Sequence, residues 1–538
     1  MRVVVGCFKV CKVYLPDDRL DGSWNDNLIL SGLTRFRLCG SSVFSVCLMI
    51  LLSGIPCHSL LGQQKQSQPN IILVYIDDLG YSDLACYGKE YGADFIETPN
   101  IDRFAQQSIK FTNAYAAAPL CSPSRAALLT GKTPARLNFE FVTKWEKDKY
   151  KATDTAWTAQ FRNFKLVPPP YTLNLPLQEK TIPELLKEAG YITAIAGKWH
   201  VSSHFNTYNG WNPDYGPARQ GFDWTANVTG AWARSNAAAR RDSKAGEFPS
   251  DSLTDQAIGY IRQKHEKPFF LYLSHYYVHT PIDADLHWLI EKYRQKAKTR
   301  GGTVSDKHIR YAAFVETMDH YVGQFLQAVE EAGLLKNSIV VFTSDNGGMP
   351  EFSLNRPLRG SKWNLYEGGI RIPLLISAPG LTKASVCNDP VSQVDFLPTF
   401  YKIAAAKNYR DQGIDGVDIS GLLTGSPKQR MPDRSMVWHF PYYHPEGKAF
   451  DTARIQIGKE DGVVSQTRPQ SAIRKGKYKL IYYHETGGTE LYKLDNDIGE
   501  EKDLNEQERG IAKQLKDELL AYLEKVKARF PAKHVEVK

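Results

Sequence analysis

Hydrophobic and polar positions follow two distinct periods from residue 69 onward. Short runs of β-branched and aromatic residues, such as NIILVYI at 70–76 and FFLYLS at 269–274, are separated by stretches whose apolar residues recur at helical spacing. Strands that alternate with helical segments are typical of a mostly parallel sheet with helices on both faces. The pattern therefore predicts an α/β fold built on a large central sheet.

Capping residues predict where some of the helices begin and end. In TIPELLKEAG, Thr181 suits the N-cap, Glu184 suits the first turn and Gly190 suits the end of the helix. Further amphipathic helices are expected at 251–267 and 309–332. These segments separate predicted strands, as an α/β pattern requires.

Polar residues follow four of the predicted strands. They are Asp77 and Asp78, Lys198 and His200, His275 and His279, and Asp345 and Asn346. Open α/β sheets bind ligands in the crevice outside the carboxyl ends of their strands. We therefore expect the chemistry of this protein at that edge of the sheet.

The C-terminal part has a different pattern. Two strands within 471–497 flank a Gly-Gly turn at 487–488, and an amphipathic helix is expected at 505–528. We expect a catalytic domain at 68–425 and a smaller C-terminal α+β subdomain at 426–538.

The first 62 residues resemble an export signal. Arg35 and Arg37 precede the apolar run SSVFSVCLMILLSGI, and small and polar residues follow it. The run is shorter than the ~20 residues that cross a bilayer, so we expect no stable membrane span after signal removal. Residues 1–34 extend unusually far upstream of a signal, which favours a true start further along the chain. The expected location is periplasmic or secreted.

Composition and cysteine count narrow the classes of function. With 42% hydrophobic and 23% charged residues, the chain is typical of a globular protein. The net charge of +8 is modest for 538 residues, and no basic run interleaves with aromatic residues, so no nucleic-acid partner is expected. Five of the eight cysteines lie in residues 1–62. At most one disulfide, from Cys86 to Cys387, is expected among the remaining three.

The acidic residues at the strand ends indicate a metal site. Asp77 and Asp78 are adjacent, and close carboxylates repel unless a cation lies between them. Asp345 and Asn346 add a carboxylate and an amide oxygen from another strand. An all-oxygen set favours Ca²⁺, with Mg²⁺ also suited. Zinc suits it less, because no cysteine or histidine pattern of zinc type accompanies these residues.

A second motif is CSPSR at 121–125. Pro123 suits an early helical position, so Cys121 would lie at a helix N-terminus, where free amides and the helix dipole favour an anion. Arg125 lies one turn further along the same face and can contact the same group. A lone buried cysteine is usually an apolar filler, but the proline and arginine at these offsets favour a chemical role.

These residues resemble the signature of a known family. PLCSPSRAALLTG at 119–131 is similar to the C-x-P-x-R signature of the type I sulfatases, which belong to the alkaline phosphatase superfamily. The resemblance extends to DDLGYSDLACYG, TPNIDRFA, GKWH, SDNGG and YEGGIRIP along the chain from residue 70. It implies an alkaline phosphatase-like fold and an arylsulfatase-type hydrolase of sulfate esters.

The resemblance also implies roles for individual residues. It implies that Ca²⁺ is held by Asp77, Asp78, Asp345 and Asn346. Cys121 would be oxidised to Cα-formylglycine by a separate formylglycine-generating oxidase, and Arg125 would support that residue. Lys198 and His200 would line the pocket.

Two further residues would contact the sulfate ester, His279 of HYYVHTP and Lys362 of RGSKWNLYEGG. The sequence departs from the family here, because Trp363 and Asn364 follow the lysine where family members often have glycine and a small residue. Because of this departure, the family pattern alone does not fix where the Lys362 side chain lies.

The chemistry of a hydrated aldehyde explains why a cysteine would be oxidised. One hydroxyl, polarised by Ca²⁺, would attack sulfur and form a covalent sulfo-enzyme, and the second would expel sulfate by returning to the aldehyde. His279 is expected to protonate the leaving alcohol, and His200 to handle a proton of the diol.

The sequence leaves two alternative functions open. A phosphatase or phosphodiesterase of the same superfamily would carry extra zinc ligands and no C-x-P-x-R, and a non-catalytic glycan-binding relative would have lost Cys121 or a metal carboxylate. We expect a carbohydrate sulfate as substrate, because of the export signal and the mildly basic charge. The ring position, exo or endo action, the oligomeric state and the roles of His275, His439 and His444 do not follow from the sequence.

Overall fold

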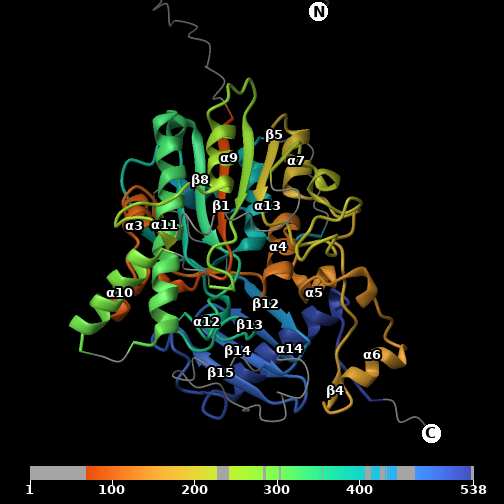
Figure 1. Ribbon diagram of the computed structural model, residues 1–538. Helices are drawn as coiled ribbons and strands as arrows, with labels where there is room; N and C mark the ends of the chain where they lie inside the picture. The colour runs from red at the N-terminus through yellow and green to blue at the C-terminus, as the bar shows by residue number, and fades with distance from the viewer. Residues whose placement is uncertain are drawn as a thin grey trace, which may run out of the picture. The chain divides into compact units, whose positions relative to one another are not determined.

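Eight strands form a central sheet, as the alternating pattern predicts (Figure 1). The computed structural model describes residues 68–226, 241–282, 286–301, 304–353, 355–405, 413–424, 431, 433–444 and 467–534. In spatial order the strands are β10 (Ser385–Cys387), β2 (Ile109–Phe111), β9 (Leu374–Ser377), β8 (Ser338–Ser344), β1 (Asn70–Ile76), β7 (Phe269–Ser274), β5 (Ile192–Gly197) and β6 (Trp224–Ala226). Among these described strands, β9 alone runs antiparallel to its neighbours, so the sheet is mostly parallel.

Helices cover both faces of the sheet. Alternate side chains of β1 point to opposite faces, so this strand packs against an apolar cluster on each side. Ile72, Val74 and Ile76 lie in one apolar cluster. Its helices are α3 (Pro99–Ala105), α9 (Ser252–Ile261), α10 (His287–Thr299) and α11 (Asp306–Glu331). Ile71 and Leu73 lie in a second cluster. The helices on that side are α4 (Cys121–Thr130), α7 (Ile182–Glu188) and α13 (Phe396–Ile403).

The helix boundaries agree with the sequence at α7 and differ elsewhere. Thr181 is the predicted N-cap, and it forms a capping box with Glu184, whose carboxylate accepts from the Thr181 amide at 2.9 Å. Helix α11 begins three residues before the expected position, because the Ser305 side chain caps it. Helix α9 ends at Ile261, before the expected 267.

A four-stranded antiparallel sheet and one helix make up the C-terminal part, consistent with the predicted α+β pattern. The strands are β12 (Ser435–Phe440), β13 (Gln470–Lys475), β14 (Tyr478–Tyr483) and β15 (Thr489–Lys493), and helix α14 (Arg509–Lys525) packs against them. Helix α14 begins later than the expected residue 505, because the Asp503 carboxylate accepts from the Asn505 amide and holds that segment in a turn. The division at 425/426 stays a prediction.

Shorter elements complete the description. They are α2 (Ala85–Gly88), α5 (Pro134–Leu137), α6 (Thr155–Gln160), α12 (Glu367–Ile370), the pair β3 (Ala114–Tyr115) and β11 (Val391–Ser392), and the pair β4 (Leu166–Val167) and β16 (Ala532–Lys533).

A buried ionic network joins β14 to α12. The ammonium of Lys479 lies 2.8 Å from Glu367 Oε1 and 2.9 Å from Glu500 Oε1, and all three side chains are fully buried. Glu367 also pairs with Arg371 at 2.7 Å. Burial and the charge of Glu367 raise the pKa of Glu500 to about 7, although Lys479 lowers it. The C-terminal sheet is thus fixed to the segment that follows Lys362.

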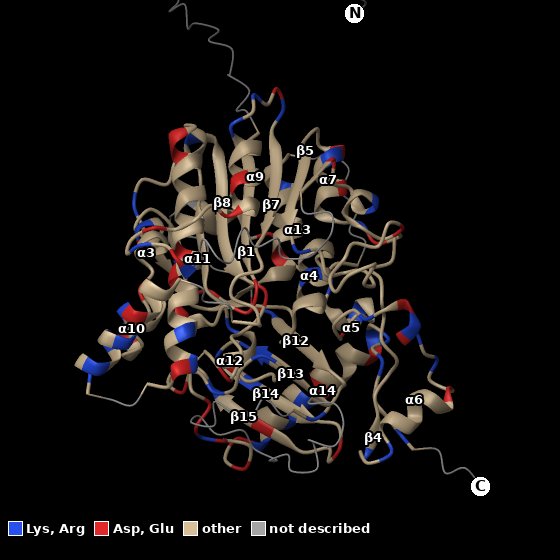
Figure 2. Ribbon diagram, viewed as in Figure 1, with Lys and Arg blue, Asp and Glu red and all other residues tan. Residues whose placement is uncertain are grey.

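Charged side chains lie mainly outside the central sheet. Figure 2 shows β1, β5, β7 and β8 without charged residues along their length, with charges on the surrounding helices. No described helix combines the length and apolar character needed to cross a membrane. The export segment at 1–62 lies outside the described residues. Cys86 and Cys387 are free, so the one disulfide that the sequence allowed does not form.

Candidate active site

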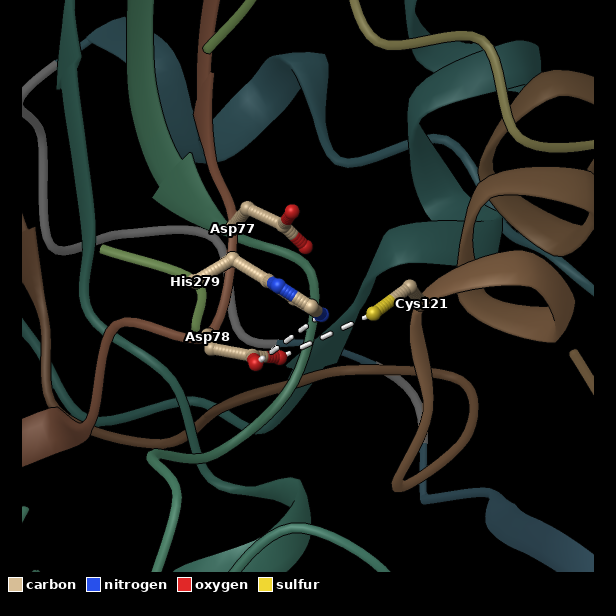
Figure 3. Close-up of side chains that lie close together, drawn as sticks. All are labelled: Asp77, Asp78, Cys121 and His279. Carbon is tan, nitrogen blue, oxygen red and sulfur yellow. Dashed lines mark hydrogen bonds and ion pairs between the residues drawn. The ribbon is translucent and has the colours of Figure 1, made fainter. Parts of the chain in front are cut away.

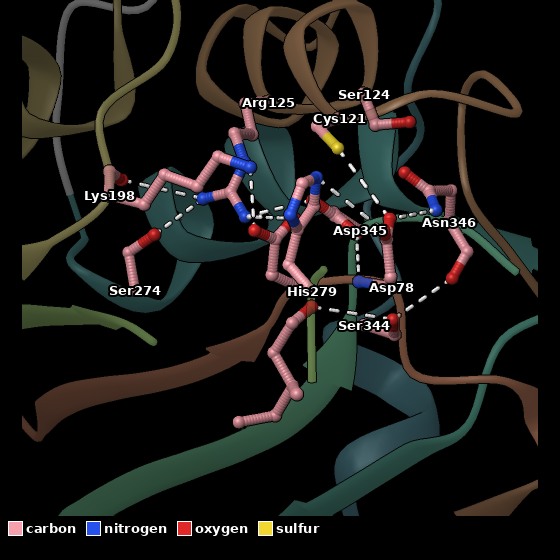
Figure 4. Close-up of polar contacts among 12 residues, drawn as sticks. Asp78, Cys121, Ser124, Arg125, Lys198, Ser274, His279, Ser344, Asp345 and Asn346 are labelled. Carbon is pink, nitrogen blue, oxygen red and sulfur yellow. Dashed lines mark hydrogen bonds and ion pairs between the residues drawn. The ribbon is translucent and has the colours of Figure 1, made fainter. Parts of the chain in front are cut away.

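Four strand ends and one helix start meet at one edge of the sheet (Figure 4). Asp77 and Asp78 follow β1, Lys198 follows β5, and Asp345 and Asn346 follow β8. His279 lies five residues beyond β7, and Cys121 is the first residue of α4. The predicted site residues therefore come from the carboxyl ends of parallel strands, where α/β sheets bind ligands.

The two adjacent aspartates face the same point because the chain turns between them. Asp78 has φ of +63°, the left-handed region, so the strand alternation ends there. Figure 3 shows both carboxylates beside Cys121 and His279. One ligand atom from each of these four residues lies within 4.8 Å of the others. The group is almost completely buried, with His279 partly exposed.

Asp345 and Asn346 lie beside this group. Asp345 Oδ1 accepts from the Asp78 amide at 3.0 Å. The Asn346 amide nitrogen donates to Asp78 Oδ1 and to the Gly347 carbonyl, both at 2.8 Å. These two bonds fix the orientation of Asn346, whose buried Oδ1 has no hydrogen-bond partner among the described residues. A buried oxygen without a donor is costly, unless it binds a ligand such as a cation.

Cationic side chains pair with each carboxylate of the site. Lys198 Nζ lies 2.6 Å from Asp77 Oδ2, and Lys362 Nζ lies 2.7 Å from Asp78 Oδ2. Burial raises the pKa of Asp77, but Lys198 outweighs this together with other nearby positive charge and holds the pKa well below its usual range. Burial and the charge of Asp77 raise the pKa of Asp345 to about 7. Asp345 is therefore the carboxylate of the three whose negative charge the surrounding side chains stabilise least.

Arg125 serves the carboxylates and not the cysteine side chain. Its guanidinium lies 2.8 Å from Asp345 Oδ2 and 3.5 Å from Asp77 Oδ1. It also donates to the hydroxyls of Ser274 and Tyr272. The sequence predicted a contact between Arg125 and the group at Cys121; among the described residues the guanidinium pairs instead with the buried acids, which attract a cation more strongly than a neutral thiol does. Sequence analysis missed Ser274 and Tyr272, although Ser274 lies at a strand end like the other site residues.

Cys121 is buried at the start of α4. Its residue is 1% exposed, and Sγ lies 3.6 Å from Asp78 Oδ1. Burial, with the charge of Asp345, raises the pKa of the thiol well above its usual range. The thiol therefore stays protonated at neutral pH and is a weak nucleophile.

Lys362 reaches the site despite the unusual residue that follows it. Trp363 has φ of +86°, a conformation that favours glycine, and its amide donates to the Pro119 carbonyl at 3.0 Å. Its ring stacks on His444 with centroids 3.6 Å apart. Asn364 Oδ1 accepts from the Ser361 amide at 3.1 Å. Both departures from the family pattern thus have a structural role in the loop.

The two predicted catalytic histidines differ in their surroundings. His279 Nδ1 lies 2.6 Å from the Thr280 carbonyl, which leaves Nε2 toward Asp78 Oδ2 at 3.6 Å. Burial lowers the pKa of His279 below its usual value, although Asp77 and Asp78 act in the opposite direction. His200 is 4% exposed with φ of +57°, and neither ring nitrogen has a hydrogen-bond partner in the described part of the chain. Burial and Lys198 lower the pKa of His200 well below its usual range, so the ring is neutral.

Two of the histidines left without a role, His275 and His439, have partners outside this group of carboxylates. His275 Nε2 lies 3.3 Å from the Thr254 hydroxyl and 3.7 Å from Asp251, the N-cap of α9. His439 contacts Ser471 and the Arg529 carbonyl in the C-terminal part. These contacts suit structural roles.

Comparison with known proteins places the chain in a class and then in a family. An α/β sheet whose strand ends gather buried acids, lysines and a helix-start cysteine is the kind of site expected of an enzyme that binds a small ligand at this edge. A family model described as Sulfatase matches residues 69–406, and one described as N-sulphoglucosamine sulphohydrolase, C-terminal, matches 361–527. The chain belongs to the sulfatase family and is a sulfuric ester hydrolase.

Individual relatives support this assignment over most of the chain. A sulfatase of Formosa agariphila is 31% identical, and the match covers 88% of this chain and 92% of the relative. N-acetylgalactosamine-6-sulfatase of Mus musculus is 32% identical over 73% of this chain and 72% of its own. The crystal structure of Ps i-CgsB has a TM-score of 0.64 at 24% identity, covering 85% of this chain and 93% of that one, and shows that the fold is shared.

Proposed function

We propose that this enzyme hydrolyses a sulfate ester of a carbohydrate to an alcohol and inorganic sulfate, with Ca²⁺ and with Cys121 oxidised to Cα-formylglycine. The observation that carries the proposal is the position of Cys121, whose sulfur lies 3.6 Å from an oxygen of the buried acidic pair. A nucleophile at position 121 could attack a sulfate ester bound to a cation that this acidic pair holds.

The donor set fits a hard divalent cation. Asp77, Asp78 and Asp345 supply carboxylate oxygens, and Asn346 supplies the buried Oδ1 that lacks a partner among the described residues. Oxygen-only ligands of this kind suit Ca²⁺, with Mg²⁺ as the alternative. When bound, the cation would polarise an ester or hydroxyl oxygen and offset negative charge.

The charges of the pocket favour an anionic substrate. The three carboxylates are matched by Lys198, Lys362 and Arg125, so the side chains alone are close to neutral. A divalent cation therefore gives the pocket a net positive charge, which attracts a sulfate monoester. The ammonium groups of Lys198 and Lys362 can also bind sulfuryl oxygens, and donors of this kind typically contribute on the order of 3 kcal/mol each to catalysis.

Oxidation of Cys121 would supply the nucleophile of the reaction. A formylglycine supplies, as its hydrate, a hydroxyl nucleophile and a second hydroxyl through which the residue is regenerated.

His279 and His200 would carry out the proton transfers of the reaction. Thr280 fixes the ring of His279 through Nδ1, so Nε2 faces the carboxylates and can hold a proton for the leaving alcohol. His200 has two ring nitrogens without partners among the described residues, so it can accept a proton from the hydroxyl at position 121.

The test compares an aryl sulfate with the matching aryl phosphate. Enzyme co-expressed with a formylglycine-generating oxidase should hydrolyse the sulfate in preference, and peptide mass spectrometry should find an aldehyde at position 121. Cys121→Ala should abolish activity, whereas Cys86→Ala, a partly buried cysteine outside the site, should retain it. Preference for the phosphate, or full activity with an unmodified thiol, would overturn the proposal.

Carbohydrate specificity and export complete the proposal. The relative named N-acetylgalactosamine-6-sulfatase supports a sulfated sugar as substrate, and the signal-like segment at 1–62 supports export to the periplasm or the medium. Hydrolysis of a panel of sulfated mono- and oligosaccharides, and N-terminal sequencing of the exported protein, test these two points.

A further inference from the structure

An exposed tyrosine lies in the loop that follows the GKWH segment. Tyr208 is 58% exposed, although the residues behind it, His204 and His200, are almost fully buried. The Tyr208 and His204 rings lie 4.7 Å apart, and the Tyr208 and His200 rings 6.4 Å apart. Tyr208 is thus the outermost of three rings that lead from the site to solvent.

The loop that carries Tyr208 is built to hold one conformation. Asn206 and Asn209 adopt left-handed φ values of +60° and +64°. A Cβ at Gly210 would lie 1.9 Å from the Phe205 carbonyl oxygen, so this tight return of the chain requires glycine. The Asn209 amide donates to His204 Nδ1 at 3.3 Å. Tyr208 is therefore presented on a fixed turn and costs little entropy to engage a ligand.

The phenol of Tyr208 lies within the electrostatic reach of the site. Desolvation raises its pKa, and the charges of Lys198 and Lys362 act in the opposite direction. These are the two lysines that pair with Asp77 and Asp78. Because Tyr208 is exposed and its ring contacts His204 and His200, the latter two residues beyond Lys198, it lies at the entrance to the site.

We propose that Tyr208 is a specificity-determining residue that contacts the sugar ring bearing the sulfate. An aromatic face packs against the apolar C–H face of a pyranose, and the phenol can hydrogen-bond a sugar hydroxyl. The inference rests on the proposed carbohydrate sulfatase function. It assigns recognition of the sugar to Tyr208 and recognition of the sulfate to the buried lysines.

A neighbouring aromatic residue provides a matched control. Phe205 is 44% exposed on the same loop, but it lines a separate cavity of about 430 Å³ together with Trp211 and Pro217. Phe205→Ala removes an exposed ring from the loop without removing the one that faces the site.

The experiment separates the sugar from the sulfate. For Tyr208→Ala, Tyr208→Phe and Phe205→Ala, one measures KM for the best substrate among the 3-, 4- and 6-sulfates of galactose, N-acetylgalactosamine and N-acetylglucosamine and the 2-sulfate of galactose. One also measures the Ki of inorganic sulfate, which fills the anion pocket but carries no ring. Tyr208→Ala should raise KM about tenfold, with Tyr208→Phe between it and wild type. Phe205→Ala should change KM by less than about twofold, and the Ki of sulfate should stay constant throughout.

The possible results distinguish a failure of the role of Tyr208 from a failure of the proposed function. An unchanged KM in Tyr208→Ala, or an equal rise in KM and in the Ki of sulfate, overturns the role of Tyr208. If wild-type enzyme hydrolyses the aryl sulfate but none of these sugars, this inference fails and the sulfatase chemistry stands. If it hydrolyses neither, the proposed function fails as well.

Discussion

Replacing Trp363 by glycine should leave a more stable protein than replacing it by alanine. Its φ of +86° is left-handed, which costs a residue with a Cβ about 1–2 kcal/mol. Glycine avoids this cost but loses about 0.5–1 kcal/mol more chain entropy on folding. Both variants lose the same stacking on His444. The difference should therefore be about 0.5–1 kcal/mol in favour of Trp363→Gly.

Urea denaturation of the two variants measures this difference. At Gln324, an exposed position within α11, the order should reverse, with Gln324→Ala about 1 kcal/mol more stable than Gln324→Gly. The same pair of substitutions should thus have opposite signs at the two positions. If alanine is equal to or better than glycine at position 363, the backbone of the Lys362 loop is not strained as argued.

Three further changes test other parts of the structure. Glu500→Gln should match wild type near pH 4 and be more stable near pH 8 by urea denaturation, by up to about 3 kcal/mol, because a folded pKa of about 7 against a usual 4.5 means that stability is lost as pH rises through this interval. A constant difference would contradict the raised pKa. Asn346→Ala should weaken Ca²⁺ binding at least about tenfold by calorimetric titration, since it removes the oxygen without a partner in the described residues. Thr181→Ala should lower the free energy of unfolding by about 1 kcal/mol through loss of the capping box, and Thr181→Ser should not.

The fold could be predicted where side-chain periods are long enough to read. The strands β1, β5, β7 and β8 have six or seven residues, and their polar ends gave the edge of the sheet that carries the site. The strands β2 and β10 have three residues each, and their pairing is decided by contacts distant in sequence. No local pattern of that length can indicate a partner strand.

The sequence indicated which polar residues gather at this edge of the sheet, but not how they contact one another. The sequence placed Arg125 one turn behind Cys121, yet its charge pairs with Asp345 and Asp77, which are distant in sequence. Tyr208 gave no signal, because exposure of one tyrosine in a polar loop depends on the tertiary packing of its neighbours. The sequence did not predict the conformation of Trp363 either. It did show tryptophan at a position where family members often have glycine, and the backbone has a positive φ there.

The burial of Cys121 constrains when the proposed oxidation can occur. The residue is 1% exposed, and helix α4, which begins with it, is buried along its whole length. A separate oxidase must bind the segment around Cys121 and reach its sulfur, and neither is possible while α4 is packed against the sheet. Exposing the motif requires much of this core to open, which a folded domain does rarely. On the proposed function, the modification therefore precedes folding, and the folded enzyme retains whichever side chain it acquired before α4 was buried.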